Sequence, residues 1–406
     1  MTAPTTVPRY LVPLLAAFTS LVVFTTDVYL PVLPQLGTDL GTTSAAAAAT
    51  VSAVLIGIAV GQVVIGPLSD AVGRRPPLLL GGIGYAVAHV LAALAPSIGV
   101  LLGLRVLAGL ATAACIVVTR AVVADAYPGA TAGRAFATLS AVTAIAPVVA
   151  PVAGGLLAHV MSWRGMFVML AVVAALLTAV SWRVLPETLP AERRVAPHLG
   201  AVVAGLGSVL RIRTFLAYLA ATAAFGGILF GYIGASSFVL QDAFGLTPQQ
   251  YGLVFALNAV GIFVASNLSR HLVSRTGSGR LLSTGHMTSG TGAAVLVVGV
   301  GLHSLPLVMG GLFLAVASLG LVIPAATTLG MAAAADRSGS ASGVLGICQF
   351  TVGAIAAPLA GAGGSPWSLA AVVTVSAVAG PLLLRLLRHP ESTSTDRYPS
   401  DTRRTT

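Results

Sequence analysis

The sequence predicts an all-α membrane protein with twelve transmembrane helices arranged as two six-helix bundles. Three observations support this fold class. Of the 406 residues, 56% are hydrophobic and only 8% are charged, whereas about a quarter of the residues of a soluble globular domain are charged. Uncharged runs repeatedly approach or exceed about 20 residues, the length that crosses the hydrocarbon core of a bilayer. One long polar connection, at about 186–213, separates two hydrophobic halves of similar length.

The predicted spans follow one another with short polar breaks. The first run covers about residues 10–36 and indicates a retained span, because it lacks the small-residue ending of a removable secretory signal. The runs that each supply one span are 40–69, 135–163, 165–182, 214–241 and 243–269. The runs that must be divided are 76–104 (near Pro96), 281–335 (at 303–306) and 338–384 (at the glycine-rich segment 361–366). Together these runs give about twelve helices.

The polar connection sets the domain boundaries that we expect. They are an N-terminal bundle at 1–185, a cytoplasmic linker at 186–213, a C-terminal bundle at 214–388 and a disordered cytoplasmic tail at 389–406. Two hydrophobic halves joined by a polar linker are typical of internally repeated transporters, in which the substrate site lies at the interface between the halves.

The distribution of arginine predicts the orientation of the chain. All basic residues are arginine, the net charge is +10, and the charges sit in short clusters between apolar runs. If the N-terminus is inside, all but Arg105, Arg120 and Arg164 of the 21 arginines fall in inner segments or the tail. The positive-inside rule then places both termini of a multi-pass plasma-membrane protein in the cytoplasm. Binding of nucleic acid is the less favoured use of this charge.

Two opposite charges fall inside predicted spans. At 1.5 Å per residue, Asp27 lies roughly 14 Å below the outer end of the first span, and Arg105 lies roughly 12 Å below the same surface. Placing a charged side chain inside a membrane costs a few kcal/mol of free energy, so each such residue is expected to have a functional or structural role. We favour Asp27 as a proton acceptor in a substrate cavity, with Arg105 tuning or relaying its proton. The alternative is a static ion pair that fixes helix packing.

Other polar and aromatic residues near mid-span are candidates for the substrate cavity. Gln62, Asn258 and Gln349 can each bond a ligand or a neighbouring helix. In the seventh span, Phe230 and Tyr232 can stack on an aromatic substrate or pack in the core.

A second constellation lies at the inner end of the second span, in residues 66–76. Gly66 and Gly73 allow close helix approach and a tight turn, and Asp70 can accept hydrogen bonds from a facing helix N-terminus. Arg74 and Arg75 then anchor the loop at an anionic leaflet.

These segments resemble the major facilitator superfamily and, within it, the twelve-span drug:proton antiporters of the Bcr/CflA type, which include chloramphenicol and florfenicol exporters. The likeness covers essentially the whole chain. Residues 66–75 are similar to the superfamily's loop signature, with Ala71 in place of a usual basic residue. Residues 27–31 resemble the subgroup's first-span D-x-Y-L-P motif. The resemblance implies that Asp27 takes part in drug and proton coupling, and it adds Tyr29 to the expected cavity.

Three more motifs carry the resemblance. Residues 101–109 are similar to a fourth-span motif linked to proton transfer by Arg105, with Ala108 in place of its usual glutamine. Residues 120–125 resemble an R-A-x-V-R-D element that begins at Arg120 and ends at Asp125, with Ala124 in place of the second arginine. The fifth span is similar to an antiporter signature, which implies a bent helix that seals the transporter against leak. Its residues are Pro147, Pro151, Gly154 and Gly155.

The sequence therefore predicts a proton-coupled antiporter that exports small amphipathic drugs, with phenicol-type antibiotics favoured, across the bacterial plasma membrane. We expect a monomer in the lipid bilayer whose partners are drug and protons, with no cofactor, no metal and no nucleic acid. The sequence has no nucleotide-binding loop and no hydrolase motif, so it does not predict an enzyme. The alternatives left open are a transporter of an endogenous metabolite, an importer and a membrane ligand sensor.

Overall fold

The computed structural model describes residues 10–127, 129–195 and 199–387, and over these residues the chain forms helices and no strands. The tail expected at 389–406 lies outside the described residues. Helices of the first half are α1 (Leu11–Asp27), η1 (Leu30–Val32), α2 (Leu33–Asp39), α3 (Ser44–Val72), α4 (Arg75–Ala93), α5 (Ile98–Ala126), α6 (Gly129–Leu157) and α7 (Trp163–Val184).

The linker and the second half are also helical. The linker contains the short helices η2 (Ala191–Arg193) and α8 (Leu199–Val209). The helices that follow are α9 (Arg213–Phe238), η3 (Val239–Ala243), α10 (Pro248–Gly301), α11 (Leu305–Ala317), α12 (Leu319–Ala333), η4 (Ala335–Arg337), α13 (Ser338–Ala360), η5 (Ala362–Gly364) and α14 (Pro366–Leu387).

Local sequence explains where several helices begin. The Thr43 side chain caps α3 by accepting a hydrogen bond from the Ala46 amide at 3.2 Å. At α10, Thr247 and Gln250 form a capping box in which each side chain accepts from the other residue's amide. Such caps satisfy amides that have no partner within their own helix.

The number of spans agrees with the sequence. Within the described residues, 11 helices are long and apolar enough to cross a membrane. One of them, α10, is 54 residues long and contains Gly277 with φ 74° and ψ 154°, which is not helical. Because a helix of about 20 residues already crosses the bilayer, α10 makes two passes, and the twelve predicted spans are confirmed.

The first span differs from the single helix expected over 10–36. The α-helix ends at Asp27, a 3₁₀ turn follows at Leu30–Val32, and α2 then begins at Leu33. Pro31 and Pro34 explain this break, since proline has no amide to donate and clashes with the preceding turn. By contrast, α6 continues as one helix through Pro147 and Pro151.

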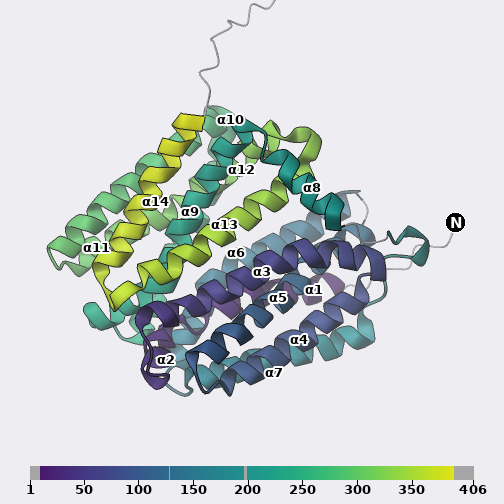
Figure 1. The fold of residues 1–406 in the computed structure, drawn as a ribbon, viewed down its shortest axis with the longest axis horizontal. Helices are drawn as coiled ribbons and strands as arrows, with labels where there is room; N and C mark the ends of the chain where they lie inside the picture. Colours follow the sequence, from purple (N-terminus) through teal and green to yellow (C-terminus); the bar gives the residue numbers. More distant parts are fainter. Residues whose placement is uncertain (1–9, 128, 196–198, 388–406) are drawn as a thin grey trace, which may run out of the picture.

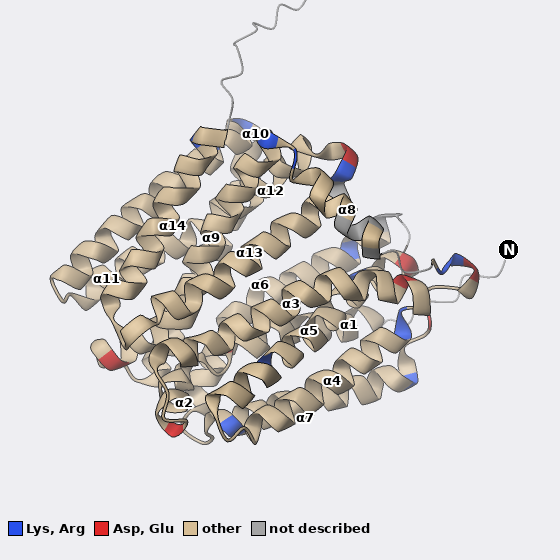
Figure 2. Cartoon of the chain, viewed as in Figure 1, with Lys and Arg blue, Asp and Glu red and all other residues tan. Residues whose placement is uncertain are grey.

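Figure 1 shows two groups of helices. Helices α1–α7, in purple to blue-green, lie below helices α9–α14, in teal to yellow, and α8 lies beside the junction. Short segments carry the charges: in Figure 2, arginines gather along the end of the molecule near the N-terminus, α8 and the kink of α10. We call this the arginine-rich end. The opposite end, formed by η1, α2 and the start of α3, is called the α2 end.

Candidate functional site

A cavity of about 360 Å³ lies between the two groups of helices. Helices α1, α3 and α6 of the first half and α9, α10, α11 and α13 of the second half line it. The lining residues are Val22, Val23, Thr26, Asp27, Leu55, Ile58, Thr143, Ala144, Pro147, Leu229, Phe230, Tyr232, Ile233, Phe255, Asn258, Ala259, Ile262, Phe263, Ser266, Val316 and Phe350. Its wall is apolar and aromatic with a few polar groups, which is the usual make-up of a small-molecule site.

Asp27 is the one acidic residue among those that line the cavity. It is the last residue of α1, at the edge of the proline-induced break, and it is 4% exposed. Its buried Oδ1 atom has no hydrogen-bond partner among the described residues. A carboxylate in an apolar membrane interior with an unpaired oxygen is costly to keep, so its position indicates a functional group.

Arg105 is fully buried inside the first group of helices and does not pair with Asp27. Its Nη2 donates to the Thr25 carbonyl oxygen at 2.6 Å, and its guanidinium centre lies 4.6 Å from the Tyr29 ring centroid and 5.1 Å from that of Phe167. Carbonyl oxygens and aromatic faces both stabilise a guanidinium. No Arg105 nitrogen lies within 4.0 Å of a carboxylate in the described part of the chain. The alternative of a static Asp27–Arg105 ion pair is therefore wrong.

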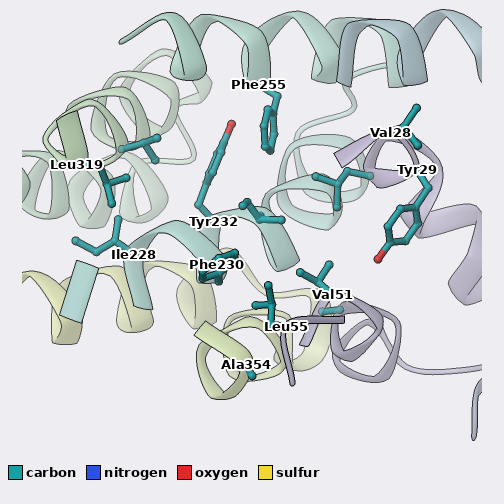
Figure 3. Close-up of a cluster of buried hydrophobic side chains, with 14 of the residues drawn as sticks. Val28, Tyr29, Val51, Leu55, Ile228, Phe230, Tyr232, Phe255, Leu319 and Ala354 are labelled. Atoms are coloured by element: carbon teal, nitrogen blue, oxygen red, sulfur yellow. The ribbon is translucent and has the colours of Figure 1, made fainter. Parts of the chain in front are cut away.

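Three of the six other residues expected in the cavity line it. Asn258 Nδ2 donates to the Tyr232 hydroxyl at 2.9 Å, and the rings of Tyr232 and Phe255 stack with centroids 5.1 Å apart. Figure 3 shows these two rings side by side, with Phe230 below them. Asn258 Oδ1 has no partner among the described residues, so it is available to a ligand.

The other three expected residues lie elsewhere. Tyr29 is fully buried among its own helices, where its hydroxyl bonds Thr50 Oγ1 at 2.9 Å. Gln62 and Gln349 are not among the lining residues. Tyr29 lies just after the end of α1, between α1 and η1, and Figure 3 shows it apart from Tyr232 and Phe255.

The sequence analysis did not identify Phe255 and Thr143 as cavity residues. Phe255 lies three residues before Asn258, and Thr143 lies four residues before Pro147. Residues three or four apart share one face of a helix. That spacing would have found both residues once Asn258 and Pro147 were placed at the cavity.

The fifth-span signature packs closely at the α2 end. A Cβ atom on Gly154 would collide with the carbonyl oxygen of Val28 in the break of α1, and one on Gly155 would lie 2.9 Å from the carbonyl oxygen of Pro248 at the start of α10. Pro147 lines the cavity, and the Pro151 carbonyl lies against Gly252. Small residues let helix backbones approach in this way.

The inner-loop constellation forms a charge cluster around Arg74. Arg74 donates to Asp125 Oδ2 at 2.8 Å, Asp70 Oδ1 at 2.5 Å and Ser69 Oγ at 2.8 Å. Burial alone lowers the pKa of Arg74, but the hydrogen bonds and charges of Asp125 and Asp70 outweigh it and raise the pKa above its ordinary value. The cluster therefore holds α3, α4 and α5 together through a charged guanidinium.

Glu187 completes this cluster, although the sequence analysis did not select it as a site residue. Its carboxylate accepts from the amides of Arg74 at 2.8 Å and Arg75 at 3.2 Å. Gly73 has φ 100° and ψ 174°, and a Cβ atom there would collide with this carboxylate. In the sequence, Glu187 stands between Pro186 and Thr188 at the start of the polar connection.

Two residues expected with this cluster do not join it. A Cβ atom on Gly66 would have only Val117 nearby, at 4.0 Å, so no close helix approach requires a glycine there. Arg120 is exposed and makes no hydrogen bond or ion pair with any described residue. It lines a smaller hollow of about 300 Å³.

The two groups of helices are joined by hydrogen bonds at the α2 end. Within the described part of the chain, the bonds between them run from Ser44 Oγ to Gly361 O (2.9 Å), Ser237 Oγ to Leu30 O (2.6 Å), Gln241 Nε2 to Pro31 O (3.0 Å) and Gln249 Nε2 to Gly155 O (2.9 Å). The hollow beside Arg120 shares Thr143 and Ala144 with the main cavity. The cavity is thus held shut at the α2 end and adjoins a hollow on its other side.

Solved structures and known relatives agree with this architecture. A bacterial homologue of the human lysosomal transporter Spinster, in an inward-facing and unoccupied conformation, aligns with a TM-score of 0.74 at 16% identity, over 96% of this chain and 100% of that one. The partially occluded, inward-open xylose transporter XylE from E. coli aligns with a TM-score of 0.69 at 12% identity, over 94% and 97% of the two chains. At these identities the likeness concerns the fold alone.

Several curated proteins share a higher sequence identity with this chain than these solved structures do. An uncharacterized MFS-type transporter of Bacillus subtilis (strain 168), YdgK, is 33% identical over 360 residues, 88% of this chain and 90% of the relative. A chloramphenicol resistance protein of Pseudomonas aeruginosa is 32% identical over 70% of this chain and 67% of that protein. A bicyclomycin resistance protein homologue of Haemophilus influenzae is 28% identical over 82% and 84%. The sequence model of the Major Facilitator Superfamily matches residues 15–358. The chain therefore belongs to the Major Facilitator Superfamily, whose members are membrane transporters and not enzymes.

Proposed function

We propose that this transporter exports small amphipathic drugs, with phenicol-type antibiotics favoured, from the bacterial cytoplasm in exchange for protons. Relatives described as chloramphenicol and bicyclomycin resistance proteins support the drug class. The aromatic, largely apolar cavity of about 360 Å³ has the size of a site for a drug-sized molecule.

The observation that carries the proposal is the position of Asp27. It is the acid on the cavity wall, it is almost fully buried, and its Oδ1 atom has no partner among the described residues. An unpaired carboxylate oxygen can take up and release a proton without breaking a structural hydrogen bond. Drug and proton therefore compete for one place.

The proposed cycle uses the two ends of the molecule in turn. Drug enters from the arginine-rich end, which faces the cytoplasm by the positive-inside rule, while Asp27 is deprotonated and the α2 end is closed. The two six-helix halves then rock so that the cavity opens at the α2 end. A proton from outside neutralises Asp27 and the drug leaves. The neutral site then returns inward and releases the proton to the cytoplasm, which restores deprotonated Asp27. A single protein chain performs the cycle as a monomer.

The energy available to one proton is sufficient for useful export. Moving one charge through 100 mV releases about 2.3 kcal/mol, and one pH unit adds about 1.4 kcal/mol. Together these sustain a drug gradient of several hundredfold, since each 1.4 kcal/mol is a factor of ten.

Uptake of chloramphenicol into inverted vesicles under an imposed pH gradient tests this proposal. Wild-type protein should accumulate the drug, and the accumulation should collapse when a protonophore is added. Asp27→Asn should abolish uptake against the gradient. Asp242→Asn, an exposed acid at the α2 end, is the matched control and should pump normally. An Asp27→Asn protein that still pumps uphill contradicts the proposed coupling, and loss of drug from the vesicles indicates an importer.

A further inference from the structure

Arg120 is a charge that the proposed mechanism does not use. Arg120 begins the segment that resembles the R-A-x-V-R-D element, and Asp125, which ends it, is bound by Arg74 Nε at 2.8 Å. Arg120 keeps no hydrogen bond or ion pair with a described residue, and its side chain is exposed. Its guanidinium is therefore free to meet an anionic group from outside the protein.

The hollow beside Arg120 is more polar than the main cavity, although Phe136, Leu139 and Ala144 also line it. It has a volume of about 300 Å³ and is lined by Thr19 of α1, Arg120 of α5 and a face of α6. Ser140 supplies a hydroxyl group on that face, whereas the hydroxyl of Thr143 already donates to the Leu139 carbonyl oxygen at 2.8 Å. A guanidinium with a serine hydroxyl beside it is suited to binding carboxylate or phosphate oxygens.

The hollow and the main cavity lie next to each other and share part of their walls. Thr143 and Ala144 belong to both walls. Along α1, Thr19 lies eight residues before Asp27, which corresponds to roughly 12 Å at 1.5 Å per residue. A molecule with an aromatic ring and a polar arm is long enough to reach from one part to the other.

We propose that the Arg120 hollow is a subsite for an anionic group on an aromatic, amphipathic substrate. The aromatic part lies against Phe230, Tyr232 and Phe255, and the anion meets Arg120. The inference rests on the proposed function and extends its substrate class from neutral phenicols to aromatic molecules that carry a carboxylate arm.

Three probes with one nitrophenyl-propanediol core test the subsite. They are chloramphenicol (neutral), chloramphenicol succinate (anionic) and the deacylated chloramphenicol amine (cationic), and binding to the full chain in nanodiscs is measured by calorimetry. Arg120→Gln should weaken binding of the succinate by about fivefold, the scale of a partly exposed charge pair. It should change chloramphenicol binding by less than twofold, and binding of the amine should become tighter.

Two further variants separate a binding role from a structural one. Arg134→Gln removes an exposed arginine of α6 that does not line the hollow, and it should leave the binding of all three probes unchanged. Arg120→Lys keeps the charge and should retain most of the preference for the succinate. In wild-type protein, added salt should weaken binding of the succinate more than binding of chloramphenicol.

The possible contrary results contradict different parts of the proposals. Equal weakening of all three probes by Arg120→Gln, or an unchanged affinity for the succinate, overturns the subsite while chloramphenicol export stands. If none of the probes binds wild-type protein, both the subsite and the phenicol preference fail. Uphill pumping by Asp27→Asn overturns only the proposed proton coupling.

Discussion

Arg105 holds the carbonyl oxygen of Thr25 at 2.6 Å, two residues before Asp27, and forms no ion pair with Asp27 itself. The positive charge inside the first group of helices is thus stabilised by a backbone dipole and two aromatic rings. Asp27 does not have to stay ionised to balance it. Arg105 fixes the backbone that presents Asp27 to the cavity.

The stability of Asp27→Asn follows from this arrangement. Breaking a buried ion pair costs about 3–5 kcal/mol, because the remaining charge is left without a partner. Since Asp27 has no such partner here, Asp27→Asn should leave the apparent melting temperature of the detergent-purified protein unchanged or raise it. Arg105→Gln should lower that temperature, because charge-assisted hydrogen bonds are worth about 1.5–3 kcal/mol each. Thermal unfolding followed by tryptophan fluorescence measures both. A large drop for Asp27→Asn would favour a hidden ion pair.

Gly73→Ala should destabilise the inner charge cluster. The φ and ψ of Gly73 (100° and 174°) lie in a region that only glycine adopts readily, and forcing another residue into such a region costs about 1–3 kcal/mol. The new Cβ atom would also displace the carboxylate of Glu187. Thermal unfolding should show a clear loss of stability for Gly73→Ala. Gly41→Ala is the control, because Gly41 has φ 57° but open space around it. If both substitutions lower the unfolding temperature equally, the collision with Glu187 contributes nothing to the loss of stability at Gly73.

Ser237 and Gln241 should govern closure of the α2 end. They donate to the carbonyl oxygens of Leu30 (2.6 Å) and Pro31 (3.0 Å) in the break after Asp27. In an unbroken helix the Leu30 carbonyl would accept from the amide of residue 34, but Pro34 has none. Ser237→Ala combined with Gln241→Leu should therefore shift the protein toward a conformation that is open at this end.

A buried cysteine reports that opening. Ala48 is fully buried on α3, against Gly361 of the other half. In a background with Cys115 and Cys348 replaced by alanine, maleimide labelling of Ala48→Cys in nanodiscs should become several times faster in the double variant. Ser236→Ala is the matched control, because Ser236 bonds Tyr251 within its own half. Labelling that speeds up equally in the control, or not at all in the folded double variant, contradicts the prediction.

Gly154→Ala should weaken the seal between α6 and α1. The added methyl group would collide with the Val28 carbonyl oxygen, and overpacking of this kind costs about 1–3 kcal/mol. We expect lower thermal stability and a faster proton leak in vesicles, measured with a pH-sensitive dye. Gly133→Ala on the same helix is the control, since a Cβ atom there meets nothing within 4 Å. If Gly154→Ala neither leaks protons nor loses thermal stability, α1 can move away from the added methyl group without a cost in free energy.

The sequence predicted the spans well because hydropathy is a local property. Runs of apolar residues and the breaks near Pro96, 303–306 and 361–366 mark helices wherever the chain is placed. It missed the break after Asp27, although Pro31 and Pro34 signalled it. The expected single helix over 10–36 did not take into account the two amides that these prolines remove.

The site was predicted less completely. Asp27 was selected because a carboxylate inside a span costs free energy and is retained only where it has a role. This argument requires no knowledge of packing. Tyr29 was added from the resemblance, and Gln62 and Gln349 were selected on type and depth alone. These three residues are not among those that line the cavity. Phe255 was passed over because an apolar residue in a span looks the same whether it faces lipid, a neighbouring helix or a ligand.

By itself the sequence determined a twelve-span helical transporter with two halves, an arginine-rich end and one acid near mid-span. The tertiary structure decided which groups meet: Arg105 turns to the Thr25 carbonyl, Asp125 goes to Arg74, and Arg120 is left beside a hollow. The reason is that hydropathy and charge depend on the residue alone. The partner of a side chain depends on how each helix is rotated and broken, and packing against the other helices sets both.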